Sequence, residues 1–304
     1  MWKKEPFSGL LCKGVSERLY KLDSRTSEAV DFMNAMTSNG LIEVSGIQLY
    51  HEVRGSGPSV LFIQGAFGDG GTYEQVAELL ADEFTVVTYD RRANSRSPRP
   101  AGWESTSTEE QSDDAASLIE ALDIAPAAVF GNSGGAIIGL DLIIRHPGLL
   151  RGAILHDPAM FSVLSRPEDV MEPVQQAVEK GIREEGLRGG GASFLRFFAG
   201  DEAFEHLEPE LRERMLGNAE VFFDLEFGAI GPYRPHKGSL AAVDVPVRVM
   251  AGTESPPPLV AVARWLAERM DVELELLPGA HTPYFDRPEE MAQALRPLLR
   301  ELSR

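Results

Sequence analysis

The sequence predicts an α/β protein built on a mostly parallel central sheet that is flanked by helices. Two observations lead to this fold class. First, short apolar runs suited to buried strands alternate with segments of helical periodicity along most of the chain. Second, the 304 residues are enough to bury the core of one large domain or two ordinary ones. In such sheets, ligands bind beyond the carboxyl ends of the strands.

The first strand signals follow a polar segment. Residues 1–40 mix charged, small and polar residues and are predicted to form an N-terminal arm, with a helix packed on a neighbour as the alternative. Residues 41–53 then indicate two strands that turn at Ser45-Gly46, in the manner of a hairpin. After a Gly- and Pro-containing turn, residues 59–63 form an apolar run that predicts a buried strand.

Helix and strand signals then alternate up to residue 156. Acidic residues in the first turn of the segment that starts at Thr108 suit the dipole of a helix. The predicted elements are a helix over 73–81, a strand over 84–89, a helix over 108–122, a strand over 127–130, a helix after residue 134 and a strand over 152–156.

Residues 158–240 break the alternation and are predicted to form a helical cap inserted between two strands. Helical segments are expected over 169–185, 194–198 and 209–223, and Gly189-Gly190-Gly191 suggests a hinge-like loop. The many aromatic side chains of this segment are expected mainly in the cap's own core, with some at the entrance to a pocket.

Regular alternation resumes after the cap. The predicted elements are a strand over 245–251, a helix whose apolar face runs from Leu259 to Met270, a strand over 272–277 and a closing helix over 289–302. The core is therefore expected to comprise residues 41–157 and 241–304.

Composition narrows the classes of partner. There are 29 Lys and Arg residues against 47 Asp and Glu residues, a net charge of −18, which argues against nucleic acid or an anionic membrane as the main partner. Cys12 is the single cysteine, so no intrachain disulfide is expected. No signal-peptide segment or apolar run of membrane-spanning length is found. We expect a cytoplasmic protein that binds a small molecule, with a homo-oligomer left open.

One stretch carries the strongest chemical signal. Gly131-Asn132-Ser133-Gly134-Gly135 joins an apolar strand to an apolar helix, which is the context of a G-x-S-x-G nucleophile elbow. Small residues are needed there because a Cβ at the flanking positions would collide with the strand and the helix. The alternative is a glycine-rich turn that contains a serine by chance.

With these elements in order, residues 41–302 resemble the α/β-hydrolase superfamily, in its lid-bearing branch of serine hydrolases. The resemblance implies a catalytic triad in the order Ser, acid, His. Ser133 falls on the nucleophile. His281 falls on the base, because Pro278-Gly279-Ala280-His281 follows a strand and is similar to the family's Gly-x-Gly-His loop.

The resemblance leaves the acid open between two residues. The family's commonest position for it, in the loop after residues 247–251, is occupied here by Ser255. Glu254 is one residue away, and Asp157 ends the preceding strand, where some branches carry the acid. We favour Asp157, because Glu254 would need its longer side chain to compensate for the register offset.

The resemblance also implies an oxyanion hole formed by the backbone N–H groups of Ala66 and Gly134, although Gln64 stands where the family usually has histidine. Phe67 is expected to line the substrate pocket, and Asn132 is the second expected substrate-binding residue. The segment 90–97 is similar to a family stretch with glycines at the positions of Ala93 and Ser95, and is expected to brace the structure.

The function implied is that of a cofactor-free serine hydrolase that cleaves a small hydrophobic ester, lactone or similar carbonyl substrate through an acyl-enzyme. A C–C hydrolase, an amidase or peptidase, and a perhydrolase-type haloperoxidase would use the same triad. A non-catalytic small-molecule receptor on the same fold is the alternative from another class. No H-E-x-x-H or C-x-x-C motif is present, so no metal is expected.

Overall fold

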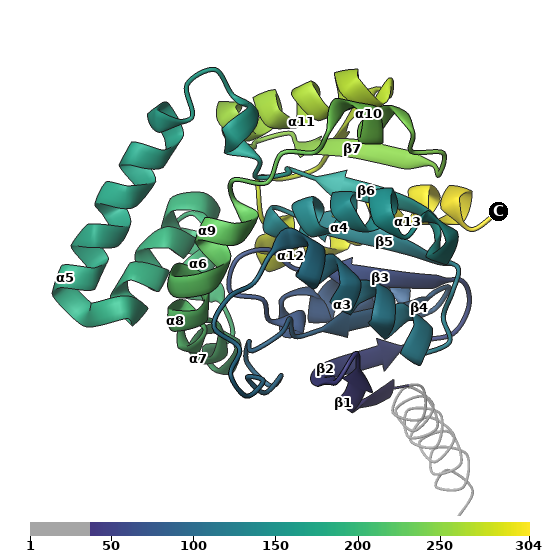
Figure 1. The fold of residues 1–304 in the computed structure, drawn as a ribbon, viewed down its shortest axis with the longest axis horizontal. Helices are drawn as coiled ribbons and strands as arrows, with labels where there is room; N and C mark the ends of the chain where they lie inside the picture. The colour runs from purple at the N-terminus through teal and green to yellow at the C-terminus, as the bar shows by residue number, and fades with distance from the viewer. Residues whose placement is uncertain (1–36) are drawn as a thin grey trace, which may run out of the picture.

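The computed structural model describes residues 37–304, so most of the predicted arm lies outside the described residues (Figure 1). Strand β1 spans Thr37–Val44 and therefore begins before the predicted boundary at residue 41. The extension arises because residues 37–40 continue the antiparallel ladder with β2, with Thr37 opposite Arg54. Backbone pairing with β2 therefore makes residues 37–40 part of the strand, although their polar sequence does not predict one.

Within residues 37–304, eight strands form one sheet in the order β1-β2-β4-β3-β5-β6-β7-β8. Strand β2 is antiparallel to both of its neighbours, and all other pairs are parallel. This confirms the predicted α/β class with a mostly parallel sheet. The remaining strands are β2 (Ile47–Arg54), β3 (Ser59–Ile63), β4 (Thr85–Tyr89), β5 (Ala127–Asn132), β6 (Leu150–His156), β7 (Val247–Gly252) and β8 (Leu274–Leu277).

Helices cover both faces of the sheet (Figure 1). One apolar layer contains α3 (Thr108–Ala121), α4 (Gly134–Arg145) and α11 (Pro257–Met270). The other contains α2 (Glu74–Leu80) and α13 (Pro288–Leu302). All six residues of β5 are buried, as expected for a central strand between two helical layers. The end of β5 is therefore a firmly supported position for a functional side chain.

The segment between β6 and β7 is helical and gathers at one side of the sheet (Figure 1). Its longest element, α5, has 32 residues and is interrupted by non-helical angles at Glu185 and Gly186. No helix in the described part of the chain has both the length and the apolar character needed to span a membrane. The helices are α5 (Glu168–Ala199), α6 (Asp201–His206), α7 (Pro209–Gly217), α8 (Ala219–Val221), the π-helical turn η4 (Phe222–Glu226), α9 (Phe227–Ile230) and α10 (Lys237–Ala241).

The prediction of a hinge-like loop at Gly189-Gly190-Gly191 is wrong, because these residues are helical within α5. They permit close packing across the break at Gly186. A Cβ added to Gly189 would lie 2.5 Å from the carbonyl oxygen of Gly181 on the other arm of α5. A Cβ on Gly191 would lie 3.1 Å from the ring of Phe67 in the core. Sequence pattern alone does not distinguish a flexible glycine from one that is required by a close contact.

Candidate active site

Ser133 occupies the sharp turn between β5 and α4. Its backbone angles, φ 57° and ψ −121°, belong to a region that residues other than glycine rarely adopt. Cβ atoms added at Gly131 and Gly135 would lie 2.4 Å and 2.0 Å from backbone oxygens of Gly135 and Ile63. The close approach of strand and helix therefore requires glycine at both positions, as the sequence pattern predicts.

The loop after β3 lies directly against this turn. A Cβ added to Gly65 would be 2.9 Å from Cβ of Ser133 and 3.2 Å from the amide nitrogen of Gly134. Ala66 and Gly134, the two predicted oxyanion donors, border the same cavity as Ser133. Backbone groups from two different elements thus lie beside the serine.

Asp157 and His281 meet from the loops after β6 and β8. Nδ1 of His281 lies 3.1 Å from Oδ2 of Asp157, and both side chains are almost completely buried. Because an ionised carboxylate only accepts hydrogen bonds, Nδ1 carries the proton and donates it. Nε2 lies on the far side of the ring. His281 and Ser133 line the same narrow cavity, so the three predicted triad residues occupy one site.

Ser255 and Glu254 behave differently from each other. The Ser255 hydroxyl, at the position where the family usually has its acid, donates a hydrogen bond to Oδ2 of Asp157. The Glu254 side chain is 54% exposed and pairs with Arg287, with distances of 2.7 Å and 3.1 Å. Of the two candidate acids, the structure brings Asp157 to His281 and places Glu254 in a surface ion pair.

The surroundings of Asp157 favour its ionised form. Burial alone would raise the pKa of this carboxyl, but the neighbouring His156 and the hydrogen bonds from His281 and Ser255 hold it below its usual range. The amide of Gly252 also points at Oδ1, at 3.4 Å. Asp157 adopts a positive φ of 45°, a strained conformation for a residue with a side chain. The carboxylate is therefore positioned and charged at neutral pH.

His156 is a part of this site that the sequence reasoning placed only at the end of a strand. Its ring is completely buried, and Nε2 lies 3.8 Å from Oδ2 of Asp157. Burial is the main reason that its pKa falls from 6.5 to about 4, so the ring is neutral at pH 7. Its position directly before Asp157 was the available signal. A lone histidine at a strand end does not reveal which groups surround it.

Phe67 differs from expectation, whereas Asn132 borders the narrow cavity together with Ser133. The prediction that Phe67 lines the substrate pocket is wrong: its side chain is fully buried and stacks on Phe222 at a centroid distance of 4.5 Å. Asn132 is also fully buried, and its Nδ2 lies 2.9 Å from Nδ1 of His156 and 3.0 Å from the carbonyl oxygen of His281. Its amide is thus occupied by contacts that brace the site.

A cavity of about 360 Å³ opens beside Ser133, and its wall is mostly apolar. Aromatic side chains from the segment between β6 and β7, the predicted cap, make up much of this wall. Two charged residues, Arg91 and Glu226, also border it, although the sequence analysis did not single them out as pocket residues. A narrower cavity of about 40 Å³ connects Ser133 with His281, Phe194 and Phe198.

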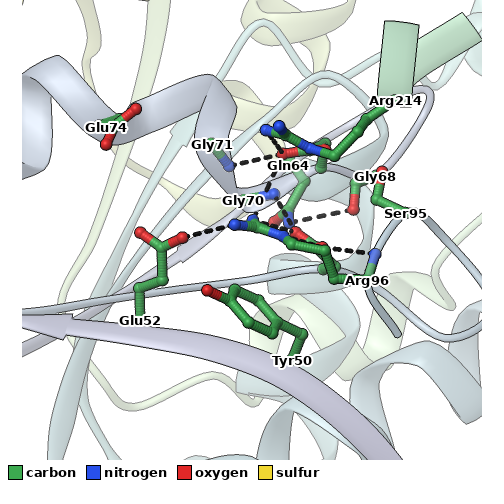
Figure 2. A network of polar contacts seen from close by, with 12 residues as sticks. Tyr50, Glu52, Gln64, Gly68, Gly70, Gly71, Glu74, Ser95, Arg96 and Arg214 are labelled. Carbon is green, nitrogen blue, oxygen red and sulfur yellow. Dashed lines mark hydrogen bonds and ion pairs between the residues drawn. The ribbon is translucent and has the colours of Figure 1, made fainter. Parts of the chain in front are cut away.

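The segment 90–97 forms a network of charges (Figure 2). Nε of Arg96 donates to Asp90 at 2.7 Å, and Nη1 donates to Glu52 at 2.6 Å. Ala93 and Ser95, at the two family glycine positions, retain positive φ angles of 60° and 48°. The loop therefore keeps a left-handed backbone at both positions despite losing glycine.

Side chains from the helical segment between β6 and β7 bind residues 90–97 and the loop after β3. Nδ2 of Asn218 donates to the carbonyl oxygen of Phe67 at 2.6 Å, and the amide of Ser95 donates to Oδ1 of Asn218 at 2.7 Å. Nε of Arg214 donates to Asp69 at 2.7 Å, and Figure 2 shows Arg214 close to Gly71. The loop that carries Ala66 is thereby held by residues of the segment between β6 and β7.

A serine on such a turn, beside an imidazole–carboxylate pair at the edge of a mostly parallel sheet, is typical of the α/β class of hydrolases. A model described as the alpha/beta hydrolase family matches residues 60–294. The chain belongs to this family.

Individual relatives agree with that assignment. The chain is 34% identical over 268 residues to the uncharacterized hydrolase YraK of Bacillus subtilis (strain 168), covering 86% of this chain and 96% of the relative. It is 25% identical over 254 residues to the zearalenone hydrolase of Bionectria ochroleuca, covering 82% and 92%. A solved structure of a thermophilic esterase from Thermogutta terrifontis shares the fold, with a TM-score of 0.67, 23% identity and coverage of 88% and 100%. The protein is a hydrolase.

Proposed function

We propose that this hydrolase is a cofactor-free serine hydrolase that cleaves an ester, a lactone or a similar carbonyl substrate through an acyl-enzyme. The observation that carries the proposal is the 3.1 Å contact between His281 Nδ1 and Asp157 Oδ2, in a site that also holds Ser133. A serine hydroxyl is a weak nucleophile until a neighbouring base accepts its proton, and this pair supplies such a base.

In the proposed first half-reaction, Ser133 Oγ attacks the carbonyl carbon while Nε2 of His281 takes the hydroxyl proton. The N–H groups of Ala66 and Gly134 stabilise the negative charge that develops on the carbonyl oxygen. The bond to the leaving alcohol then breaks as His281 gives the proton to that oxygen. The acyl group remains on Ser133. Asp157 holds the imidazole tautomer and stabilises the imidazolium.

In the second half-reaction, water attacks the acyl carbon and gives a proton to His281. The same two N–H groups stabilise the second tetrahedral intermediate. The bond between the acyl carbon and Ser133 Oγ breaks, and His281 returns the proton to Oγ. The carboxylic acid leaves and the free serine is restored.

The substrate class is inferred from the cavity and from the relatives. Burial of apolar surface against a mostly aromatic and aliphatic wall favours a hydrophobic acyl group. Relatives and structural neighbours include a zearalenone hydrolase and an enol-lactonase from Burkholderia xenovorans, which shares the fold at a TM-score of 0.67 and 21% identity. We therefore propose that lactones are among the substrates.

The test uses p-nitrophenyl butyrate hydrolysis and labelling with a fluorophosphonate probe. Wild type should turn over the ester and take up one probe at Ser133, located by mass spectrometry, whereas Ser133→Ala should do neither. Ser117→Ala, which removes a surface hydroxyl bonded to Ser45, serves as the matched control and should behave as wild type. A folded wild type without labelling and without turnover would refute the proposal and favour the receptor alternative.

A further inference from the structure

The larger cavity contains one feature that the proposed reaction does not use. Among the described residues that line it, only Arg91 and Glu226 are charged. Both side chains are 1% exposed, and they form an ion pair with distances of 2.6 Å and 2.8 Å. A charged pair in an otherwise mostly apolar wall is the starting point for an inference about the substrate, which rests on the proposed function.

The pair lies close to the reacting groups. Nη2 of Arg91 donates to the carbonyl oxygen of Gly65 at 2.8 Å. Gly65 in turn approaches Ser133 so closely that an added Cβ would be 2.9 Å from Cβ of Ser133. Gly65 therefore lies between the Arg91 guanidinium and Ser133. A substrate group bound at the ion pair would lie close to the carbonyl group that Ser133 attacks.

Local backbone geometry aims Glu226 at this position. Residues Phe222–Glu226 form a π-helical turn, in which the N–H of Phe227 bonds to the carbonyl oxygen of Phe222. Such turns are rare and frequently lie at functional sites, because the extra residue redirects a side chain. Stability gives little reason for the pair, since an apolar pair of similar volume is often as stable as a buried ion pair.

The pair has hydrogen-bonding capacity that the protein leaves unused. Oε1 of Glu226 accepts from Arg91 and from Nδ2 of Asn94, but Oε2 accepts only from Arg91. A carboxylate oxygen offers about two lone-pair sites, so Oε2 retains one. Nε of Arg91 is buried and has no partner among the described residues. The free acceptor site on Oε2 suits a hydroxyl group, which can donate a hydrogen bond to it.

The location of His281 indicates which half of the substrate reaches the pair. In the proposed reaction His281 protonates the leaving alcohol, so the alcohol must lie beside it. His281 borders the narrow cavity, whereas Arg91 and Glu226 border the larger one. The larger cavity therefore takes the acyl group.

We propose that the Arg91–Glu226 pair is a specificity determinant that binds a hydroxyl group on the acyl portion of the substrate. The substrate class is then a hydroxyacyl ester or lactone whose remaining acyl surface is apolar. Glu226 Oε2 accepts the hydroxyl proton as a hydrogen bond.

The experiment compares matched esters on wild type and Glu226→Gln. The pairs are p-nitrophenyl 3-hydroxybutyrate with the butyrate, and p-nitrophenyl 6-hydroxyhexanoate with the hexanoate, so that two hydroxyl positions are sampled. For at least one pair, the ratio of kcat/KM for the hydroxylated over the plain ester should fall about tenfold in Glu226→Gln, a typical loss for a hydrogen bond to a charged group. Because each ratio is taken on one preparation, it does not depend on the folded fraction.

Glu220→Gln removes an exposed carboxylate of the same cap region and should leave both ratios unchanged. If Glu226→Gln does not fold, Glu226→Asp is the second variant. Its shorter side chain moves the carboxylate away from the substrate hydroxyl and should also lower the ratio of kcat/KM. Equal effects on hydroxylated and plain esters would mean that the pair only fastens the cap, and would overturn the proposal.

If wild type hydrolyses none of the esters, the proposed function fails. The proposed hydroxyl site is then tested by measuring ligand binding instead of turnover. Methyl 6-hydroxyhexanoate and methyl hexanoate are then titrated into Ser133→Ala by NMR, with and without Glu226→Gln. Tighter binding of the hydroxylated ester that is lost with Glu226→Gln supports the hydroxyl site. Equal binding of the two esters refutes it.

Discussion

At the scale of single residues, Asp157 combines three properties that a triad acid needs. It contacts His281, it is buried, and the groups around it hold its pKa below its usual range. Ser255 adds to this arrangement, because its hydroxyl supports a carboxylate that arrives from a different strand. The residue at the position where the family commonly has its acid is here a hydrogen-bond donor to Asp157.

The first prediction separates Asp157 from Glu254. Asp157→Asn should lower kcat for p-nitrophenyl butyrate by about 10³-fold or more, because the amide no longer enforces the reactive tautomer of His281. Glu254→Gln should change kcat by less than about twofold, since it removes only an exposed ion pair with Arg287. Steady-state kinetics on both variants, with circular dichroism as the control for folding, measure this. Similar losses in the two variants would contradict the assignment.

Not every residue of the site is accessible to sequence reasoning. Ser133 and His281 could be predicted because each lies in a local motif whose glycines and order are visible in the chain. The partnership of Arg91 with Glu226 joins residues 135 positions apart, and no local pattern marks it. Phe67 was expected in the pocket wall, but the cap packs against its ring and covers it.

At the scale of elements, α5 shows how glycine allows two helical arms to pack. The chain reverses at Gly186, with φ 69°, and the two arms then touch through Gly181 and Gly189. Added Cβ atoms at Gly181 and Gly189 would lie 2.3 Å and 2.5 Å from the opposite backbone oxygen. Such contacts cannot be relieved by moving the end of a flexible side chain.

The second prediction tests this packing. Gly189→Ala should lower the free energy of unfolding by about 1–3 kcal/mol, the usual cost of forcing extra volume into a close contact. Gly217→Ala is the matched control, because an added Cβ there meets nothing within 4 Å. It should be neutral or stabilise by up to about 1 kcal/mol. Urea denaturation measures both, and a Gly189→Ala protein as stable as the control would contradict the close packing of the two arms.

At the scale of the whole molecule, the folding equilibrium should depend on the charge of one buried imidazole. His156 has a folded pKa of about 4 against an ordinary value of 6.5, chiefly because of burial. Between these values the unfolded chain binds the proton and the folded chain does not. The stability contributed by neutral His156 is therefore present above about pH 6.5 and is lost as the pH falls towards 4.

The third prediction compares wild type with His156→Gln. The difference between their free energies of unfolding should shrink by about 2 kcal/mol between about pH 7 and about pH 5, because only wild type loses this contribution. Urea denaturation at several pH values measures the difference, which cancels titrations common to both proteins. A difference that stays constant with pH would show that His156 does not titrate as a buried neutral ring.

The architecture of the sheet was the easiest part to predict. Strands such as β3 and β5 are buried on both faces, so each appears in the sequence as a short apolar run. The predicted end of a helix at residue 185 agrees with the break in α5. The first four residues of β1 and the helical conformation of Gly189-Gly190-Gly191 lack such a signal, because pairing with β2 and contact between two helical arms determine them. An element can be predicted where its burial shows as a run of apolar residues. It cannot be predicted where contact with a segment distant in sequence determines its structure.

The polar anchors of the cap have a consequence for redesign. Arg214, Asn218 and Glu226 fasten the α7–η4 part of the cap to the core, whereas the first arm of α5 contributes Met171 and Val174 to the cavity wall. Substitutions in that arm change the cavity wall without touching the anchors of the loop that carries Ala66. A library confined to the first arm of α5 can therefore vary part of the cavity wall while the contacts of Arg214 and Asn218 with the loop that carries Ala66 are kept.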